Sequence, residues 1–157
     1  MSILYNGNFQ SNSNGQVLYI APQMSVDNWI LDLGNLHVCH DGVILNSGHM
    51  KHHYDENSEK LLLKNFRGHI LVFSVSYDAL SMSKGTILTI GISDGSFSSI
   101  MRTNETSGTV RVSHRISYGA VMIQPFIDTT DSNTSIKIHS ASLEPWNDKF
   151  IQESVKG

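Results

Sequence analysis

The chain has 157 residues, a formal net charge of −3 and only 16% charged residues. This length predicts one domain with a core of its own, and the single cysteine, Cys39, rules out an internal disulfide. Because there is no basic excess, nucleic acid is not expected as a partner, and no stretch approaches the roughly 18 apolar residues that a membrane helix needs. Residues 1–20 contain no Lys, no Arg and no apolar run, so we expect no signal peptide and synthesis in the cytoplasm.

Short apolar and β-branched runs recur along the chain between polar turn residues, without the 3.6-residue spacing of a helix. These runs predict strands at residues 3–9, 16–20, 29–33, 35–40, 43–46, 60–65, 68–77, 86–93, 96–103, 109–116, 120–127 and 135–144. Asp41-Gly42 and Asp94-Gly95 have the sequence of hairpin turns. Residues 47–59 form the longest polar connection and are expected to be a mobile surface loop. Many short strands with frequent turns predict a β-sandwich or barrel.

Alternation within the strands predicts one packed face and one polar face. In residues 109–116, Val110, Val112 and Ile116 share one face with His114, while Arg111, Ser113 and Arg115 share the other. Residues 86–93 alternate in the same way, with three apolar side chains on one face: Leu88, Ile90 and Ile92. Ile70–Val75 is apolar on both faces and is expected to be a central strand.

Three segments of the chain, in their order and spacing, resemble the jelly-roll carbohydrate-binding modules. The resemblance is strongest to the members of this family that occur in bacteriophage tail-fibre and baseplate proteins. They are YNGNF near the start with a tryptophan about twenty residues later, LKNFRGHILVFSVSYDA in the middle and IKIHSASLE at the end. The residues that match this family pattern are Asn6, Gly7, Phe9, Asp27, Trp29, Gly68, Phe73, Ala141, Leu143 and Glu144.

The resemblance implies an all-β fold, a two-sheet antiparallel jelly-roll β-sandwich with little helix, over residues 1–144. Residues 145–157 would be a C-terminal tail or linker. It also implies that the last strand lies beside the first and that the protein is a virion component, with a homotrimer as the implied assembly. Trp29 is expected to plug one end of the core.

Many modules of this family hold a structural calcium ion with a Glu after the first-strand Phe and an Asp in the last strand. The corresponding positions here are Gln10 and the His139–Ser140 region, and neither offers a carboxylate. We therefore expect no tight calcium site, no other metal and no cofactor.

The histidines and acids do not form a catalytic or metal-binding motif. His37 and Cys39 would share a strand face while His40 points away, and His49, His52 and His53 are expected to be solvated loop residues. The acid pairs Asp55/Glu56 and Asp128/Asp131 fall in polar segments, and no nucleophile-elbow, zinc-protease or phosphate-loop motif is present. We expect that the protein is not an enzyme.

Ligand binding is the remaining function. Sugars are held by aromatic faces and by polar side chains that bind hydroxyls, and the candidate ligand-binding residues are Arg111, Arg115, Gln124, Tyr77, Tyr118 and Trp146. The sequence favours a non-catalytic module of a phage tail or baseplate that binds a cell-surface glycan or a virion protein partner. Two alternatives stay open: a purely structural assembly or decoration protein, and a binding module detached from a bacterial glycoside hydrolase.

Overall fold

The computed structural model describes residues 2–81, 85–130 and 134–150. In these ranges the elements are β1 (Leu18–Ile20), β2 (Gln23–Met24), β3 (Trp29–Cys39), β4 (Gly42–His52), α1 (Glu56–Phe66), β5 (Ile70–Ala79), β6 (Leu88–Ser93), β7 (Ser98–Thr103), β8 (Ser107–Arg115), β9 (Gln124–Asp128) and β10 (Ser135–Pro145).

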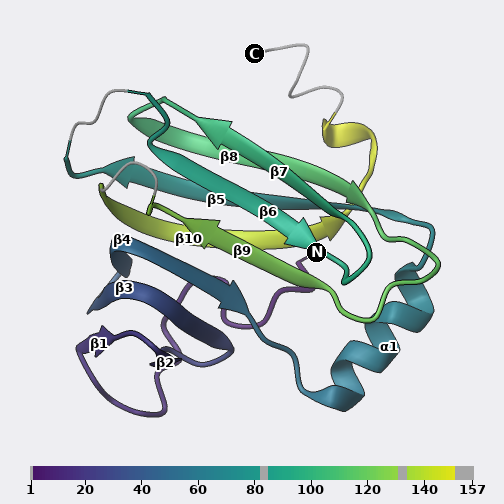
Figure 1. Ribbon diagram of the computed structural model, residues 1–157, viewed down its shortest axis with the longest axis horizontal. Coiled ribbons are helices and arrows are strands. Elements are labelled where there is room, and N and C mark those ends of the chain that lie inside the picture. Colours follow the sequence, from purple (N-terminus) through teal and green to yellow (C-terminus); the bar gives the residue numbers. More distant parts are fainter. Residues whose placement is uncertain (1, 82–84, 131–133, 151–157) are drawn as a thin grey trace.

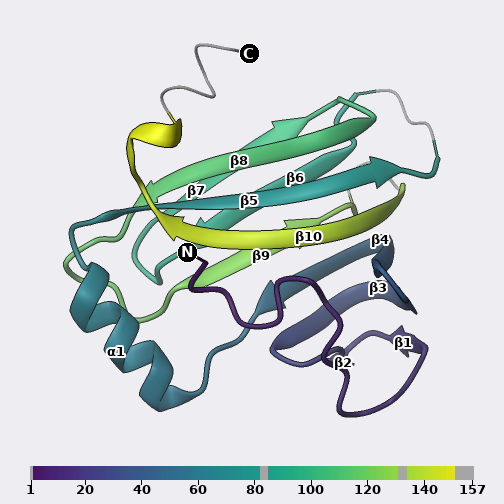
Figure 2. The same cartoon turned by 180° about the vertical axis from the view of Figure 1, so that it is seen from behind.

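The strands form two antiparallel layers that are joined through β4. The hydrogen-bonded path is β7-β6-β9-β4-β10-β5-β8, and β3 pairs with the other edge of β4. The first half of β4 pairs with β10 and its second half pairs with β9, so the path folds over at this strand. One layer is therefore β8-β5-β10 and the other is β7-β6-β9, as Figures 1 and 2 show from opposite sides. The predicted two-sheet antiparallel β-sandwich with little helix is confirmed.

Side chains from the inner faces of both layers fill the core. In β8, Val110, Val112 and His114 are buried while Arg111 and Ser113 are exposed, as the alternation predicts. β5 has a partner strand on each side, as expected of a central strand. β6 differs from its prediction because neighbouring segments cover its second face as well, so that its residues from Leu88 to Ile92 are all buried.

The predicted hairpins are both present, but one predicted strand pair is a single strand. His40 and Asp41 form the two-residue turn between β3 and β4. Residues 94–97, which begin with Asp94-Gly95, form the turn between β6 and β7. β3 runs through Gly34, where the pairing register with β4 shifts. A Cβ on Gly34 would lie 2.3 Å from the carbonyl oxygen of Asn46, and φ is +75° there, so the glycine permits this irregularity.

The predicted strand at residues 3–9 is wrong, because the segment turns. Asn6 and Phe9 have φ values of 54° and 62°, which a strand does not allow. The segment nevertheless lies beside β10, as the resemblance implies: the Ile3 amide donates to the Leu143 carbonyl at 2.7 Å, and the Ala141 amide donates to the Gly7 carbonyl at 2.7 Å. The turn places the Phe9 ring 5.2 Å from the ring of Trp29, centroid to centroid.

The predicted strand at residues 60–65 is also wrong, because this segment belongs to helix α1. Asp55 caps the helix by accepting a 2.9 Å hydrogen bond from the Ser58 amide, and Gly68, with φ +82°, follows its end. Most of the expected loop at residues 47–59 is instead regular structure: the second half of β4 and the first turn of this helix, joined by residues 53–55. No helix within the described ranges has the length and apolar character needed to cross a bilayer.

We expect Asp55→Ala to lower the free energy of unfolding by about 1 kcal/mol, the usual cost of losing such a cap. The carboxylate accepts from both the amide and the hydroxyl of Ser58, at 2.9 and 2.7 Å. Urea denaturation measures the change. Glu56→Ala is the matched control, since it removes a carboxylate from the same end of the helix, with its exposed pair to Lys60 at 3.0 Å, and leaves the cap in place. An equal loss in both variants would contradict the assigned cap.

Candidate functional site

The outer face of the β8-β5-β10 layer carries rows of small hydroxyl side chains. In one row Ser76 of β5 lies opposite Thr109 of β8 and Ser140 of β10. In the next row Ser74 lies opposite Arg111 and Ser142. Because alternate residues of a strand point to opposite faces, the sequences SVS in β5 and SAS in β10 place all four serines on this outer face.

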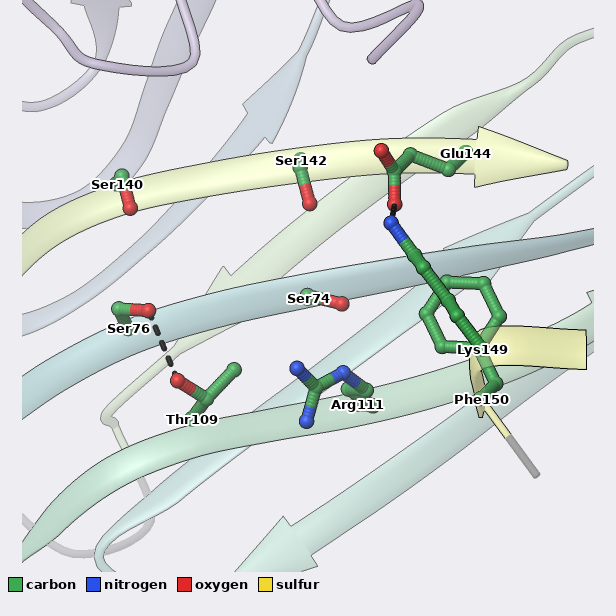
Figure 3. Close-up of a pocket in the computed structure, with 9 residues that line it drawn as sticks. All are labelled: Ser74, Ser76, Thr109, Arg111, Ser140, Ser142, Glu144, Lys149 and Phe150. Carbon is green, nitrogen blue, oxygen red and sulfur yellow. Dashed lines mark hydrogen bonds and ion pairs between the residues drawn. The ribbon is translucent and has the colours of Figure 1, made fainter. Parts of the chain in front are cut away.

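A groove of about 260 Å³ runs over these rows. It is lined by Ser74, Ser76, Thr109, Arg111, Ser140, Ser142, Glu144, Lys149 and Phe150, which are drawn in Figure 3. Arg111 lies in the row of Ser74, between Thr109 and the C-terminal turn that carries Lys149 (Figure 3). We call this feature the serine groove.

The C-terminal turn closes one end of the serine groove. After β10 the chain turns at Asn147, whose carbonyl accepts from the Phe150 amide at 3.2 Å. Lys149 then reaches back to Glu144, with Nζ 2.7 Å from Oε2, and its ammonium lies 5.1 Å from the centre of the Phe150 ring. The hydrogen bond from Lys149 lowers the pKa of Glu144, which keeps this carboxylate ionised.

A second cleft of about 250 Å³ lies on the other side of β8, toward β7, and shares Thr109 and Arg111 with the serine groove. Tyr77 lines this cleft. Its ring points inward, only 2% exposed, and its hydroxyl donates to the Glu105 carbonyl at 2.7 Å. This hydrogen bond of the Tyr77 hydroxyl connects β5 to the loop that precedes β8.

The structure does not bring the six candidate residues together. Arg111 lines both the serine groove and the second cleft, and Tyr77 lines only the cleft. Arg115 donates to the Gly68 carbonyl at 2.7 Å, and Tyr118 is 82% exposed in the loop that follows β8. The other two candidates line neither the groove nor the cleft. Gln124 is half-buried on β9 in the opposite layer, and Trp146, just after β10, is 43% exposed.

Sequence reasoning missed most of the lining of the serine groove. The signal was present as the alternating serines of FSVSY and HSASLE. That these strands are neighbours follows only from the pairing of β5 with β10, whose residues lie more than fifty positions apart in the chain. The contact between Lys149 and Glu144 had no sequence signal of its own.

The expectation that His49 and His52 are solvated loop residues is wrong, since both belong to β4. His49 Nδ1 lies 2.7 Å from Asp128 Oδ2, and its ring stacks on Phe126. His52 is 1% exposed, and its Nε2 lies 2.9 Å from the Tyr5 carbonyl oxygen. Burial lowers the pKa of His52 to about 4, so the ring is neutral at pH 7.

A buried chain of hydrogen bonds joins Ser99, His114 and Asp94. The two ring nitrogens of His114 lie 2.7 Å from Ser99 Oγ and 2.7 Å from Asp94 Oδ2. Burial by itself raises the pKa of Asp94, but the bonds from His114 and from three backbone amides outweigh it, so the pKa is lowered overall. None of the three residues lines the groove or the cleft, and the chain fastens the β6–β7 turn to β8.

The acid pairs singled out in the sequence have structural partners. Asp55 is the helix cap, and Asp128 binds His49. Asp131 lies outside the described residues.

The two positions compared with the family's calcium ligands are held by other contacts. Gln10 Nε2 donates to the Asn8 carbonyl at 3.1 Å, and His139 Nε2 lies 2.5 Å from Asp78 Oδ2. Over the ranges that the structure describes, no three His, Cys, Asp or Glu side chains are grouped so that they could hold a metal ion.

We therefore expect that EDTA leaves the thermal unfolding midpoint unchanged. Differential scanning calorimetry of the protein as purified, with and without the chelator, measures this. A drop of several degrees, restored by added Ca²⁺, would show a structural metal.

Comparison with known proteins shows the fold. No protein-family model and no curated protein matches the sequence. A structure described as "CBM4 structure and function" matches with a TM-score of 0.54 and 11% identity over 91% of this chain and 99% of that chain. "Family 16 Carbohydrate Binding Module-2" matches with a TM-score of 0.54 and 12% identity over 89% and 97%.

A third similar structure is the enzymatically active domain of tailspike protein 4 from bacteriophage CBA120. It matches with a TM-score of 0.57 and 13% identity over 92% of this chain and 21% of that chain. At these identities the likeness concerns the fold. The chain is a jelly-roll β-sandwich of the kind seen in carbohydrate-binding modules.

Proposed function

We propose that this protein is a non-catalytic glycan-binding module and that the serine groove is its binding site. The observation that carries the proposal is the double row of hydroxyls beside Arg111, on an open sheet face of a fold that carbohydrate-binding modules share. Hydroxyls donate and accept, as sugar hydroxyls do, and a rigid sheet fixes their spacing.

A glycan array followed by calorimetric titration of the hits tests this function. The double variant Ser74→Ala/Ser142→Ala removes two hydroxyls from the middle of the groove, and we expect it to weaken binding about tenfold or more. Ser98→Ala is the matched control, because Ser98 is exposed on β7 in the other layer. The proposed site would be overturned if no glycan on the array binds, or if the double variant binds as tightly as the wild-type protein and the Ser98→Ala control.

We further propose that the module works in a phage tail or baseplate, made in the host cytoplasm and assembled as a homotrimer with a virion protein partner. The likeness to a tailspike domain supports this context. Light scattering of the purified protein tests the assembly, since a trimer has three times the chain mass of 17.4 kDa. If no glycan on the array binds and the protein forms a stable oligomer, a structural assembly protein is favoured. If the gene also encodes a catalytic domain, a binding module of a glycoside hydrolase is favoured.

A further inference from the structure

We propose that a second binding site lies at the end of the β8-β5-β10 layer where α1 leads into β5, and that it binds a sugar carrying a phosphate group. Two guanidiniums and two exposed aromatic side chains lie at this end, which Figure 2 shows beside α1: Arg67, Arg115, Tyr118 and Trp146. Three of them are candidates from the sequence, and Arg67 is added by the structure. None of the four lines the serine groove, so the inference goes beyond the proposed function. We call this site the arginine end.

Arg115 and Trp146 lie on either side of Ile70. Arg115 is the partner of Ile70 at the end of β8, and the Trp146 amide donates to the Ile70 carbonyl at 2.9 Å just after β10. This row is two residues beyond the row of Glu144, where the lining of the serine groove ends. The Trp146 side chain is 43% exposed, so part of its ring surface is open to a ligand.

Tyr118 lies against Gly68, the residue between α1 and β5. A Cβ on Gly68 would lie 2.7 Å from the Tyr118 hydroxyl oxygen, so a side chain there would displace the ring. The Gly68 carbonyl also accepts from Arg115 Nη1 at 2.7 Å, so the ring and this guanidinium contact the same glycine. Tyr118 is 82% exposed, and its ring therefore offers an apolar face to solvent beside a fixed cation.

Arg67 supplies the second guanidinium from the C-terminal end of α1. Its Nη2 donates to the Ala120 carbonyl at 2.8 Å, two residues after Tyr118 in the same loop. These bonds to uncharged carbonyls orient Arg67 and Arg115 without neutralising them. Within residues 2–81, 85–130 and 134–150, neither guanidinium forms an ion pair with a carboxylate, that of Asp148 included.

The loop that carries Tyr118 is held in place from below. The Ser117 amide donates to Asp94 Oδ2 at 3.0 Å, and the Val121 amide donates to the Asp94 carbonyl at 2.9 Å. Ala120 is 1% exposed and anchors the loop in the core. The ring is therefore presented by a rigid support, which lowers the entropy that a ligand must lose on binding.

The charge of the arginine end suits a phosphate group. The whole chain has a net charge of −3, whereas this end presents two guanidiniums. A phosphate monoester carries about two negative charges at pH 7 and has three terminal oxygens, so it can accept from two planar guanidinium forks. A carboxylate has two oxygens, which one fork already occupies. The exposed rings would then pack against the C–H groups of the sugar that carries the phosphate.

Titration of isotope-labelled protein, followed by its amide signals in two-dimensional NMR spectra, tests the proposal. The ligands are glucose-6-phosphate, galactose-6-phosphate and mannose-6-phosphate, compared with the free sugars, inorganic phosphate and glucuronate. We expect at least one sugar phosphate to shift the Gly68 and Tyr118 amide signals saturably and to bind about tenfold more tightly than each comparison ligand. This affinity should fall in about 0.5 M NaCl.

Variants assign the two parts of the ligand to the two kinds of side chain. Arg115→Gln and Arg67→Gln should each weaken sugar-phosphate binding about tenfold, since each removes one fork. Tyr118→Ala/Trp146→Ala should bind the sugar phosphate no more tightly than inorganic phosphate. Circular dichroism confirms that each variant is folded.

Arg102→Gln is the matched control, because Arg102 is an exposed arginine on β7 in the other layer, and it should bind as the wild type does. Equal affinity for glucuronate, for inorganic phosphate or for the free sugars would overturn the assigned ligand. Sugar-phosphate binding that survives both arginine variants, or no binding at all, would overturn the site.

The serine groove and the arginine end can fail separately. Ser74→Ala/Ser142→Ala should leave sugar-phosphate binding unchanged, since neither serine lies in the row of Ile70. If this double variant weakens sugar-phosphate binding as much as Arg115→Gln does, the arginine end is not a site of its own. If no sugar phosphate binds while neutral glycans on the array do, this inference falls and the proposed function stands.

Discussion

Replacing Trp29 with alanine is expected to lower the free energy of unfolding by about 3–5 kcal/mol, the usual cost of deleting a fully buried aromatic side chain. The indole is 0% exposed, and its ring lies 5.2 Å from Phe9 and 5.0 Å from His52, centroid to centroid. Its Nε1 also donates to the Asn6 carbonyl at 3.1 Å. Truncation therefore leaves a cavity and removes the bond that holds the N-terminal turn.

Urea denaturation followed by far-ultraviolet circular dichroism measures this loss, because the signal does not depend on tryptophan. Trp146→Ala is the matched control. Trp146 is 43% exposed at the end of β10, and its replacement should cost less than about 1 kcal/mol. A loss below about 1 kcal/mol for Trp29→Ala would place the indole outside the core.

Acid is expected to destabilise the fold by about 3 kcal/mol through His52 alone. Burial lowers the pKa of His52 to about 4 in the folded protein, against about 6.5 for an exposed histidine. Between these two values the unfolded chain binds a proton that the folded chain does not bind. The stability from this residue is therefore complete above pH 6.5 and is lost progressively as the pH falls from 6.5 to 4.

The surroundings of His52 explain why a proton is unfavourable there. The rings of Trp29 and Tyr54 lie 5.0 and 4.5 Å away, and burial raises the pKa of Tyr54, so that its hydroxyl stays neutral. In the part of the chain that the structure describes, Nδ1 of His52 is buried without a hydrogen-bond partner. Its neighbour His53 adds unfavourable charge when protonated.

The difference between wild type and His52→Phe isolates this effect from the other titrating groups. Unfolding free energies measured from pH 7.5 to 3.5 should depend on pH less steeply in His52→Phe, with most of the difference between pH 6.5 and 4. His40→Gln is the control for replacing a histidine at the surface, since the His40 side chain is 94% exposed. If His52→Phe keeps the full slope, the assigned pKa shift is wrong.

The parts of the fold that the sequence predicts are those set by neighbouring residues. Asp94-Gly95 lies within the turn it predicts, and Asp41-Gly42 spans the last residue of its turn and the first residue of β4. The alternation in β8 fixes its buried face without reference to any other strand. The strand predicted at residues 60–65 contains three consecutive leucines, whereas the signals that mark the two ends of α1, the Asp55 cap and Gly68, lie outside that run. Both of these end signals are local, so the helix was also predictable.

The candidate site was less predictable, because its residues meet only through pairing. Arg111 was identified by its place on the polar face of one strand. The serines that surround it come from β5 and β10, and the register between these strands is a property of the whole sheet. The pair of His49 and Asp128 has the same origin, since 79 positions separate the two residues in the chain.

The placement of β4 between the two layers has a consequence for the order of folding. The chain completes the β3–β4 hairpin early, but the strands that cover the remaining edge of β4 arrive about eighty or ninety residues later. During synthesis this edge is therefore an open row of amide and carbonyl groups until β9 and β10 leave the ribosome. Because these late pairings set the rate of closure, we expect slow folding and a nascent chain that aggregates more readily than the finished protein.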